Sequence, residues 1–435
     1  MFWSRYNIIT KSEKYGYLLY NTMSQVFLRI PEEEIGLWQE LQNDPDSYTK
    51  ISGGEYLLRS RIIVANQEDD VNMYVTEFLK NKYNSSDVAV TILPTRGCNF
   101  GCIYCYEIER PNIHMNQETE AGILRFLKSN PNMKRLNVAW YGGEPLINFP
   151  SIERLSRAFL EMDIEYSARI ITNGYLLTKE KADLFGTLHI DKVQITFDGT
   201  EATHNQRRPL LGGGPTYRRI VENLKYLLSV HPNVHIDIRT NIDRRNMQEY
   251  NDFLSAFEKE IDDSRITTYP GFVSDLLSNE CVDPSLNICE GGLKADFILD
   301  LYKKHGVKID AFLPQYRLHN CIATKYFGFV IGPEGEIYKC WRSVGNKNQI
   351  IGNVNAGLFD MHQHASFMIA GDFTRDSKCL DCRFVAICGG GCPLVRIRNK
   401  RENANINPCC PEKTHIEKLM EMRYEIYVAS QQRDD

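Results

Sequence analysis

The chain has 435 residues, of which 43% are hydrophobic and 25% are charged. This length exceeds what one hydrophobic core serves, so two or three domains are expected. The net charge of −5, without a long basic run, argues against a dedicated nucleic-acid binder. The N-terminus turns polar too early for a signal peptide, and no stretch reaches the ~18 apolar residues of a membrane helix. We therefore expect a soluble, cytoplasmic protein that binds neither nucleic acid nor membrane.

Residues 1–85 are expected to form a small N-terminal α+β module. Extended runs (YNIIT, YGYLLYN and QVFLRI) occupy residues 6–30. The segment 31–44 that follows has a leading proline, an acidic first turn and apolar residues at helical spacing, so it predicts a helix. A second amphipathic helix is predicted over 71–83. The module contains no cysteine and no recognisable catalytic motif.

From residue 88 to residue 306, short β-rich runs alternate with helical stretches. This alternation predicts parallel β/α units, arranged as a partial (β/α)6 barrel or an open parallel sheet. Several strands look like continuous apolar runs, which is typical of strands covered on both faces. The chemistry of such folds gathers at the carboxyl ends of the strands. The expected strands lie within residues 88–94, 135–144, 168–174, 192–199, 234–243 and 265–272.

Three cysteines follow the first of these strands in a C-x3-C-x2-C arrangement: Cys98, Cys102 and Cys105. Three thiolates within eight residues converge only if the loop curls, and we expect Gly97 and Gly101 to relieve the backbone strain. A [4Fe–4S] cluster normally takes four cysteines, so three local ligands would leave one iron with an open position. The alternatives are three ligands of a structural zinc or a coincidental grouping. The thirteen cysteines are clustered along the chain, which favours metal binding over disulfides.

Polar and glycine-rich segments end the later strands in a fixed order. Any one of them alone is a common strand-ending turn, and Glu144 or Asp198 would also fit a helix cap. Their order and spacing after the cysteine triplet make the set specific. The segments are Gly142–Gly143–Glu144–Pro145, Thr172–Asn173–Gly174, the QITFDG run with Gln194, Thr196, Asp198 and Gly199, the pair Arg239 and Asn241, and the pair His204 and Arg207.

The triplet with Tyr104 before its third cysteine resembles the motif of the radical S-adenosylmethionine (SAM) superfamily. In that family the open iron binds the methionine part of SAM, and one electron then cleaves SAM to a 5′-deoxyadenosyl radical that abstracts hydrogen from the substrate. The cofactor carries the radical chemistry, and the protein positions and shields it. The resemblance implies SAM contacts from Tyr104, Gly142, Gly143, Glu144, Asn173, Gln194, Thr196, Asp198 and Arg239. Catalytic acid–base or hydrogen-donor residues cannot be assigned in this way.

Residues 307–435 are expected to form a loop-rich domain held together by metal. Their cysteines resemble the seven-cysteine SPASM signature of radical SAM peptide maturases, which implies two auxiliary [4Fe–4S] clusters and three clusters in all. Carried over from that family, the first auxiliary cluster uses Cys321, Cys340 and Cys392. The second uses Cys379, Cys382 and Cys388, with either Cys409 or Cys410. A fourth ligand of the first cluster is open: Cys281, Cys289, the spare cysteine of the 409/410 pair or a vacant iron position. Considered by themselves, Cys281 and Cys289 fit buried, inert thiols better than ligands.

Together these features predict a radical SAM/SPASM oxidoreductase that modifies a ribosomal precursor peptide and forms a thioether, carbon–carbon or related crosslink. The expected domains are 1–85, 86–306 and 307–435. Residues 1–85 resemble a winged-helix-like RiPP recognition element that captures a leader peptide through a strand edge, for which YGYLLYN is the candidate; a plain extension of the barrel is the alternative. A reductant such as flavodoxin or ferredoxin is the second expected partner. The rival hypotheses are an anaerobic sulfatase-maturing enzyme that makes formylglycine and a zinc-stapled peptide-binding protein without catalysis.

Overall fold

The computed structural model describes residues 1–51, 53–105, 107, 110–273, 291–308, 315–318, 321–409, 413 and 415–432. The chain divides into two compact units, each assembled from separate stretches of sequence. Unit 1 comprises Met1–Lys82, Glu290–Thr324 and Ala370–Asp435, and unit 2 comprises Tyr83–Cys289 and Lys325–Ile369. The division into domains at residues 85/86 and 306/307 stays a prediction.

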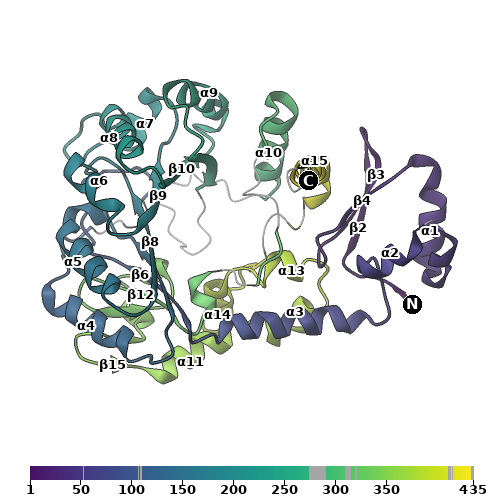
Figure 1. Ribbon diagram of the computed structural model, residues 1–435, viewed down its shortest axis with the longest axis horizontal. Coiled ribbons are helices and arrows are strands. Elements are labelled where there is room, and N and C mark those ends of the chain that lie inside the picture. The colour runs from purple at the N-terminus through teal and green to yellow at the C-terminus, as the bar shows by residue number, and fades with distance from the viewer. Residues whose placement is uncertain are drawn as a thin grey trace. The chain divides into compact units, whose positions relative to one another are not determined.

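Unit 2 is built on a parallel sheet that contains all six predicted strands. Adjacent strands pair in chain order, so each β/α unit adds one strand at the same edge. The α/β class and the parallel sheet are therefore confirmed, whereas closure into a partial barrel stays a prediction. The strands are β6 (Asp87–Ile92), β7 (Arg135–Trp140), β8 (Glu165–Thr172), β9 (Ile190–Thr196), β10 (His235–Ile242) and β11 (Ile266–Phe272), drawn at the left of Figure 1.

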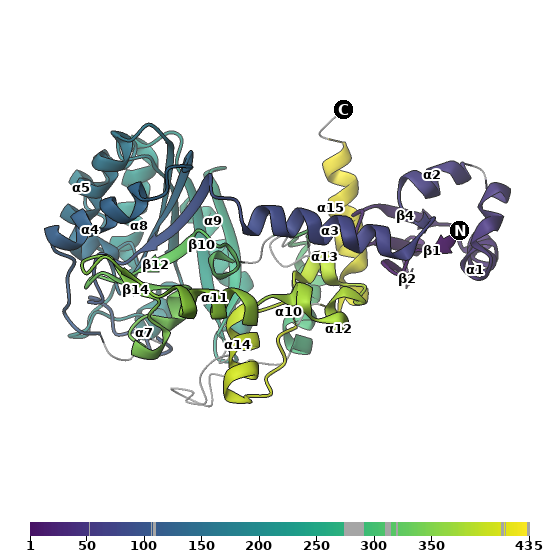
Figure 2. The same cartoon turned by 90° about the horizontal axis from the view of Figure 1, so that it is seen from below.

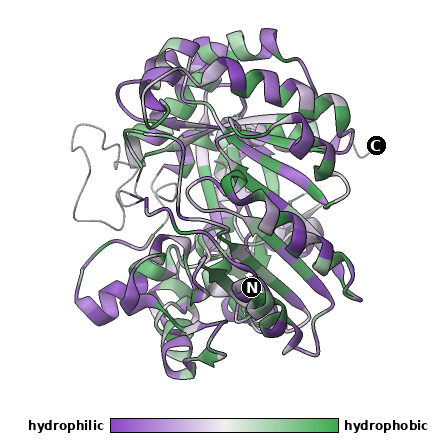
Figure 3. Ribbon diagram, turned by 90° about the vertical axis from the view of Figure 1, so that its left-hand side faces the viewer, coloured by the Kyte–Doolittle hydropathy of each residue, from purple (hydrophilic) through white to green (hydrophobic). Residues whose placement is uncertain are grey.

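Helices connect these strands and lie along one face of the sheet (Figure 1). They are amphipathic, as the striped ribbons of Figure 3 show. Helix α8, for example, buries Ile220, Leu224 and Leu227 and exposes Glu222 and Lys225. Five match predicted helices, and the short α7 was not expected. The helices are α4 (Gln117–Lys128), α5 (Phe149–Leu160), α6 (Lys179–Phe185), α7 (Glu201–Arg207), α8 (Tyr217–Val230) and α9 (Tyr250–Glu260).

The second face of the sheet is polar, which corrects the expectation that both faces are apolar. Burial alternates residue by residue along β8 and β10. Ser167 and Arg169 of β8 and Asp237 and Arg239 of β10 occupy the less buried positions, since successive side chains of a strand point to opposite faces. The apolar runs of the sequence hid a period of two, because only the helix-covered face is consistently apolar.

The sheet continues beyond the six expected strands into residues that the sequence assigned to a loop-rich C-terminal part. β12 (Gly328–Ile331) pairs in parallel with β6, and β13 (Glu336–Tyr338), β14 (Gly352–Asn353) and β15 (Leu358–Phe359) follow antiparallel. These strands have two to four residues each, too short to show a period. Helix α11 (Met361–Ala370) ends this stretch.

Unit 1 begins with an antiparallel sheet of β2 (Asn7–Ser12), β3 (Gly16–Asn21) and β4 (Phe27–Ile30), next to a small pair β1 (Phe2–Trp3) and β5 (Ile63–Val64). Helices α1 (Ile35–Asn43), α2 (Gly54–Arg59) and α3 (Gln67–Lys82) complete the module. Both predicted helices are present, although α3 begins four residues before the expected 71. YGYLLYN forms the central strand β3, so it is not the exposed edge that was expected: β2 and β4 pair with it on both sides.

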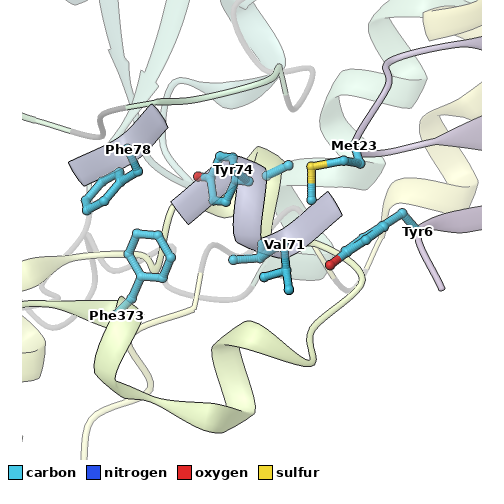
Figure 4. Packing of buried hydrophobic residues seen from close by; sticks show 8 residues of the cluster. Tyr6, Met23, Val71, Tyr74, Phe78 and Phe373 are labelled. Atoms are coloured by element: carbon cyan, nitrogen blue, oxygen red, sulfur yellow. The ribbon is translucent and has the colours of Figure 1, made fainter. Parts of the chain in front are cut away.

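The rest of unit 1 packs on α3 and on the three-stranded sheet. Figure 4 shows Val71, Tyr74 and Phe78 of α3 in one buried cluster with Phe373, Met23 and Tyr6. The chain ends in helix α15, whose Tyr424 packs edge-on against Tyr15 at 5.0 Å. The elements, shown in Figure 2, are α10 (Gly291–His305), α12 (Ser377–Leu380), α13 (Val385–Cys388), α14 (Pro393–Glu402) and α15 (Met420–Gln431).

Short 3-10 turns link these elements at Glu32–Glu34, Pro45–Lys50, Pro145–Asn148, Met247–Glu249, Ile322–Thr324, Trp341–Ser343, Lys347–Gln349, Phe373–Arg375 and Ile416–Leu419. Among the described residues, no helix has the length and apolar character needed to cross a bilayer.

Candidate functional site

A cavity of about 440 Å³ opens in unit 2 where the strands β6–β11 end. Its volume lies within the ~300–1,000 Å³ of small-molecule sites. All three thiols of the triplet line it, together with residues at the ends of the five other strands, β7–β11. The predicted site residues in the lining are Cys98, Cys102, Tyr104, Cys105, Gly142, Gly143, Thr172, Asn173, Gln194, Thr196, Arg239 and Asn241. The carboxyl edge of a parallel sheet thus assembles the site as expected.

The cysteine loop is held by hydrogen bonds rather than by glycine conformations. The guanidinium of Arg110 donates to the carbonyls of Phe100 (2.6 Å) and Cys102 (3.4 Å) and so bridges the curl. Neither Gly97 nor Gly101 has a positive φ, so the expected relief of strain at these two positions is wrong. The carbonyl of Gly97 instead accepts from the amide of Glu144 at 2.9 Å, which ties the loop to the end of β7.

Burial disfavours the thiolate form of two loop thiols, Cys98 and Cys102. It raises the pKa of Cys98 to about 12 and also raises the pKa of Cys102, although Arg208 acts in the opposite direction on Cys102. Iron binding needs thiolates, so cluster assembly must release these protons. The loop is therefore arranged to meet a positively charged metal core and not to present a nucleophilic thiolate to solvent.

Gly143 brings the end of β7 into contact with the cysteine loop. A Cβ added at Gly143 would lie 2.3 Å from the carbonyl oxygen of Gly97, a backbone atom that cannot swing away. The same addition at Gly101 meets nothing closer than 3.8 Å. Glycine is required at 143 by this close approach.

We predict that Gly143→Ala displaces the cysteine loop, while Gly101→Ala is tolerated. The first variant should lose most of its iron and of its SAM cleavage after anaerobic reconstitution, because a clash with main-chain atoms costs more than ~1–3 kcal/mol of overpacking. Iron analysis and 5′-deoxyadenosine assays on both variants measure the difference. Equal iron content and activity in the two variants would contradict the close approach.

The side chain of Glu144 does not line the cavity; it links strand ends beneath it. This fully buried carboxylate accepts from Thr172 Oγ1 (2.7 Å), from the amide of Asn173 (2.7 Å) and from the amide of Leu146 (3.0 Å). The last contact caps the 3-10 turn that begins at Pro145, which is the alternative that the sequence left open. Burial raises the pKa of Glu144, and the three donors oppose that shift.

Tyr104 lines the cavity and connects it to a buried network of charged and polar side chains. Its hydroxyl accepts from Arg208 (2.5 Å) and from Asn241 (2.9 Å), and the guanidinium of Arg207 lies 5.3 Å from its ring centre. Burial raises the pKa of Tyr104 well above its ordinary value. Asp198 is outside the cavity lining and accepts from the backbone amide of Asn241 at 3.1 Å. The phenol is thus a fixed neutral donor or acceptor at the cavity wall.

His204 and Arg207 support this network from α7. Arg207 pairs with Asp243 at 2.7 Å and approaches Asp198 at 3.5 Å. The ring of His204 accepts from the amide of Asp198 through Nδ1 and contacts Thr216 Oγ1 through Nε2 at 3.1 Å. Burial lowers the pKa of His204 well below its usual range, so the ring is neutral at physiological pH. Both residues position the site and do not line it.

Sequence motifs missed four of the five arginines of the lining, and among its aromatic residues they missed Tyr141 and Trp341. Arg110, Arg169, Arg208, Arg239 and Arg342 all line the cavity, and of these only Arg239 was singled out. Tyr141 stacks on Trp341 at 5.6 Å, and Trp341 comes from the part of unit 2 that follows β13. The only available signal was placement: Arg169 lies on the less buried face of β8, three residues before the strand ends at Thr172.

The C-terminal cysteines divide between the units. Cys379, Cys382, Cys388 and Cys409 lie in unit 1, where Lys413 interacts electrostatically with the last three and Cys379 interacts with Cys388. Cys321 and Cys392 are also in unit 1, whereas Cys340 is in unit 2, so the set expected for the first auxiliary cluster stays a prediction. Cys281, Cys289 and Cys410 lie outside the described residues.

The residues present fit the cofactors that the motifs imply. No three His, Cys, Asp or Glu side chains among the described residues converge on one metal ion. A [4Fe–4S] cube spreads its thiolates over separate corners, so its ligands lie farther apart than those of one ion. The cavity also offers a donor to a ligand. Arg208 Nε is buried, and no described residue accepts a hydrogen bond from it, so a polar or anionic ligand in the cavity would satisfy it.

Comparison with known proteins agrees with this geometry. The Radical SAM superfamily matches residues 92–257. The radical SAM cyclopropyl synthase TigE of Paramaledivibacter caminithermalis is 22% identical over 402 residues, covering 84% of this chain and 81% of TigE. The structure of anSMEcpe with bound AdoMet and Cp18Cys peptide superposes with a TM-score of 0.61 at 19% identity, covering 79% of this chain and 99% of that one. Streptococcus suis SuiB bound to precursor peptide SuiA gives 0.51 at 18% identity, covering 90% and 95%.

The two solved structures share the fold, and the family match spans the loop with Cys98, Cys102 and Cys105 and the strand ends around the cavity. The family implies SAM and a [4Fe–4S] cluster as cofactors. The chain is therefore a radical SAM enzyme whose radical SAM domain covers residues 92–257.

Proposed function

We propose that this enzyme modifies a ribosomally made precursor peptide after translation, joining two of its residues by a thioether, carbon–carbon or related bond. The observation that carries the proposal is the cavity in which three thiols of one loop meet the ends of β7–β10. The fold it shares with anSMEcpe and SuiB, each solved with a peptide bound, supports a peptide substrate.

Cys98, Cys102 and Cys105 would hold the [4Fe–4S] cluster, and the cavity wall would hold SAM. Tyr104, Gly142, Gly143, Asn173, Gln194, Thr196 and Arg239 line the cavity and are the proposed SAM contacts. Glu144 and Asp198 act indirectly, because they anchor the backbone of Asn173 and Asn241. When bound, the cluster and SAM supply a 5′-deoxyadenosyl radical that removes hydrogen from the substrate. The protein's own contribution is to orient these groups and to exclude water.

The C-terminal part would form a SPASM domain with two auxiliary [4Fe–4S] clusters, giving three in all. Cys379, Cys382 and Cys388, with Cys409 or Cys410, would hold one of them, and Cys321, Cys340 and Cys392 would hold the other. Electrostatic interactions support the site at Cys379, Cys382, Cys388 and Cys409. Cys379 interacts with Cys388, and Lys413 interacts with the other three. A cytoplasmic reductant such as flavodoxin or ferredoxin would supply the electron.

The N-terminal module would capture the leader of the precursor. Its order of three antiparallel strands followed by helices α1, α2 and α3 suits a winged-helix-like recognition element. Addition of a peptide strand requires an edge, and the edges of this sheet are β2 and β4. A proline placed in the centre of the bound leader segment removes a main-chain donor and would weaken this capture.

The charge of the cavity favours an acidic substrate. Arg110, Arg208 and Arg239 donate to neutral groups of the site, and Arg169 makes no hydrogen bond or ion pair with a described residue. Glu107 is the one carboxylate among the described lining residues. A cube with three thiolates carries about −1 and SAM about +1, so these cofactors cancel each other and leave the arginines to a substrate carboxylate.

We predict that Arg169→Gln raises the KM for the peptide roughly tenfold, ~1.4 kcal/mol, because it removes a charge-assisted hydrogen bond to an Asp or Glu near the modified residue. Replacing that acidic residue by Asn or Gln should have the same effect on the parent enzyme and none on the variant. Lys128→Gln, an exposed change on α4, is the control. An unchanged KM in Arg169→Gln would contradict the assignment of Arg169 to the substrate.

The test of the proposed function is a reaction with the short peptide encoded beside this chain's own reading frame. The reconstituted, reduced enzyme with SAM should convert it to a product lighter by two hydrogens, with the new bond located by tandem mass spectrometry. A peptide with a sulfatase motif, supplied in parallel, should stay unmodified. Formylglycine in that peptide, or the lack of any neighbouring short precursor gene, would overturn the proposal in favour of sulfatase maturation.

A further inference from the structure

Arg396 contacts one of the C-terminal cysteine sulfurs directly. Its guanidinium on α14 donates to Cys379 Sγ at 2.8 Å, to Asp376 Oδ2 at 2.9 Å and to the carbonyl of Gly390 at 2.6 Å. The side chain is 9% exposed, so its position is fixed by packing as well as by these bonds. All three nitrogens of this buried guanidinium donate hydrogen bonds, and one of these bonds goes to a sulfur of the predicted cluster site.

A second cation lies near the same group of thiols. Lys413 Nζ donates to Cys409 Sγ at 3.5 Å, and its charge also interacts with Cys382 and Cys388. The sulfur of a thiol is a weak acceptor, whereas a thiolate is a strong one. Two cations arranged around four cysteines therefore suit a site in which the sulfurs carry negative charge.

The loop between Cys388 and Cys392 is shaped to make these contacts. Gly389, Gly390 and Gly391 all have positive φ, and a Cβ at Gly391 would lie 1.7 Å from the carbonyl oxygen of Pro408. The run therefore packs against the segment that leads to Cys409 and aims the Gly390 carbonyl at Arg396. Arg396 joins the loop and the sulfur in one hydrogen-bonded unit.

We propose that Arg396, assisted by Lys413, raises the reduction potential of the auxiliary cluster held by Cys379, Cys382 and Cys388. Hydrogen bonds to cluster sulfurs and nearby positive charge stabilise the more negative, reduced state of an iron–sulfur cluster. Asp376 opposes this effect, because its carboxylate pairs with Arg396 beside the same sulfur. This inference rests on the proposed function, in which an auxiliary cluster takes an electron from the substrate.

The consequence is a favoured direction of electron flow. A cluster held by Cys379, Cys382 and Cys388 would supply a one-electron acceptor at this site. The substrate carbon radical would lose one electron to it and the nucleophile that forms the new bond would lose a proton. An oxidised flavodoxin or ferredoxin would then take that electron from the cluster. A cation at Cys379 favours the accepting step.

The test is a redox titration, followed by electron paramagnetic resonance, of the reconstituted full chain in a Cys98→Ala/Cys102→Ala/Cys105→Ala background that keeps only the auxiliary clusters. In Arg396→Gln, one auxiliary midpoint should fall by at least the equivalent of a tenfold change in the ratio of reduced to oxidised cluster, ~59 mV for one electron. Lys413→Gln should lower the same midpoint, and Asp376→Asn should raise it. Arg398→Gln, on the same helix but paired with Glu402, is the matched control and should leave it unchanged.

Opposite shifts in Arg396→Gln and Asp376→Asn identify an electrostatic effect, since damage to the fold would move both in the same direction or lose the signal. If Arg396→Gln does not retain iron, Arg396→Lys keeps the charge without the fork and should give a smaller fall. Unchanged midpoints in Arg396→Gln and Lys413→Gln would overturn the inference and leave the proposed function standing. Zinc instead of iron at these cysteines in the parent protein would overturn both the inference and the auxiliary-cluster assignment.

Discussion

5′-Deoxyadenosine production under dithionite is expected to fall to the level of a protein-free control when Cys98, Cys102 and Cys105 are all replaced by alanine. The three thiols line one cavity, and each is partly or largely removed from water, so alanine leaves no side chain in the loop able to ligate iron. Iron content should fall by about four atoms per chain, the content of one cube. High-performance liquid chromatography of the reaction and iron analysis measure the two effects.

Ile103→Ala is the control for this variant, because Ile103 is exposed in the same loop, does not line the cavity, and keeps in the variant the amide that donates to the carbonyl of Arg207. It should keep its iron and its SAM cleavage. Undiminished 5′-deoxyadenosine from the triple alanine variant would mean that the radical chemistry takes place elsewhere in the chain. The cavity described here would then lose its assigned role.

The largest expected loss of stability follows from Lys82→Met in unit 1. Lys82 ends α3 and donates to Asp372 Oδ2 at 2.7 Å, with side chains that are 2% and 5% exposed. Methionine matches the length of lysine but leaves the Asp372 carboxylate buried without its cation, which costs about 3–5 kcal/mol. Urea unfolding of the iron-free full chain followed by circular dichroism measures the change, and the exposed Lys80→Met should stay within ~0.5 kcal/mol of the parent.

A double variant separates the charge from the packing. Lys82→Met/Asp372→Leu removes both charges, so it should recover at least half of the stability lost in the single variant. Burial by itself raises the pKa of Asp372, but hydrogen bonds from Lys82 and Thr374 outweigh burial and hold that pKa below its ordinary value. The parent should therefore lose this contribution as the pH falls below the ordinary range of a carboxyl group, and the double variant should not. A double variant no more stable than Lys82→Met would contradict the ion-pair explanation.

The sequence predicts those parts of the site whose residues are close together in the chain. The loop with Cys98, Cys102 and Cys105 and the glycine pair at 142–143 are short-range patterns placed at strand ends. The alternation of β-rich runs with helical stretches predicts β6–β11 as parallel strands. Parallel topology then brings the strand ends to one edge without further information. This is why the cavity could be expected before its shape was known.

The remaining features depend on contacts between residues far apart in the chain. The position of β3 as a central strand depends on its pairing with both neighbours, and β12 acquires its place only by pairing with β6 across more than 200 residues. Glu144 illustrates the same limit: its spacing suggested a ligand contact, whereas its three donors come from Thr172, Asn173 and Leu146. The arginines of the lining have no local pattern and are identified only when the strands are placed side by side.

The central claim is that the cysteine loop near residue 100 holds a [4Fe–4S] cluster with one iron left open for SAM. Electron paramagnetic resonance of the dithionite-reduced, anaerobically reconstituted chain, recorded with and without SAM, tests it most directly. The account predicts a cluster signal whose g values shift on adding SAM, and no such shift in the Cys98→Ala/Cys102→Ala/Cys105→Ala variant. A parent spectrum that SAM leaves unchanged, or a colourless protein that contains zinc in place of iron, would contradict it.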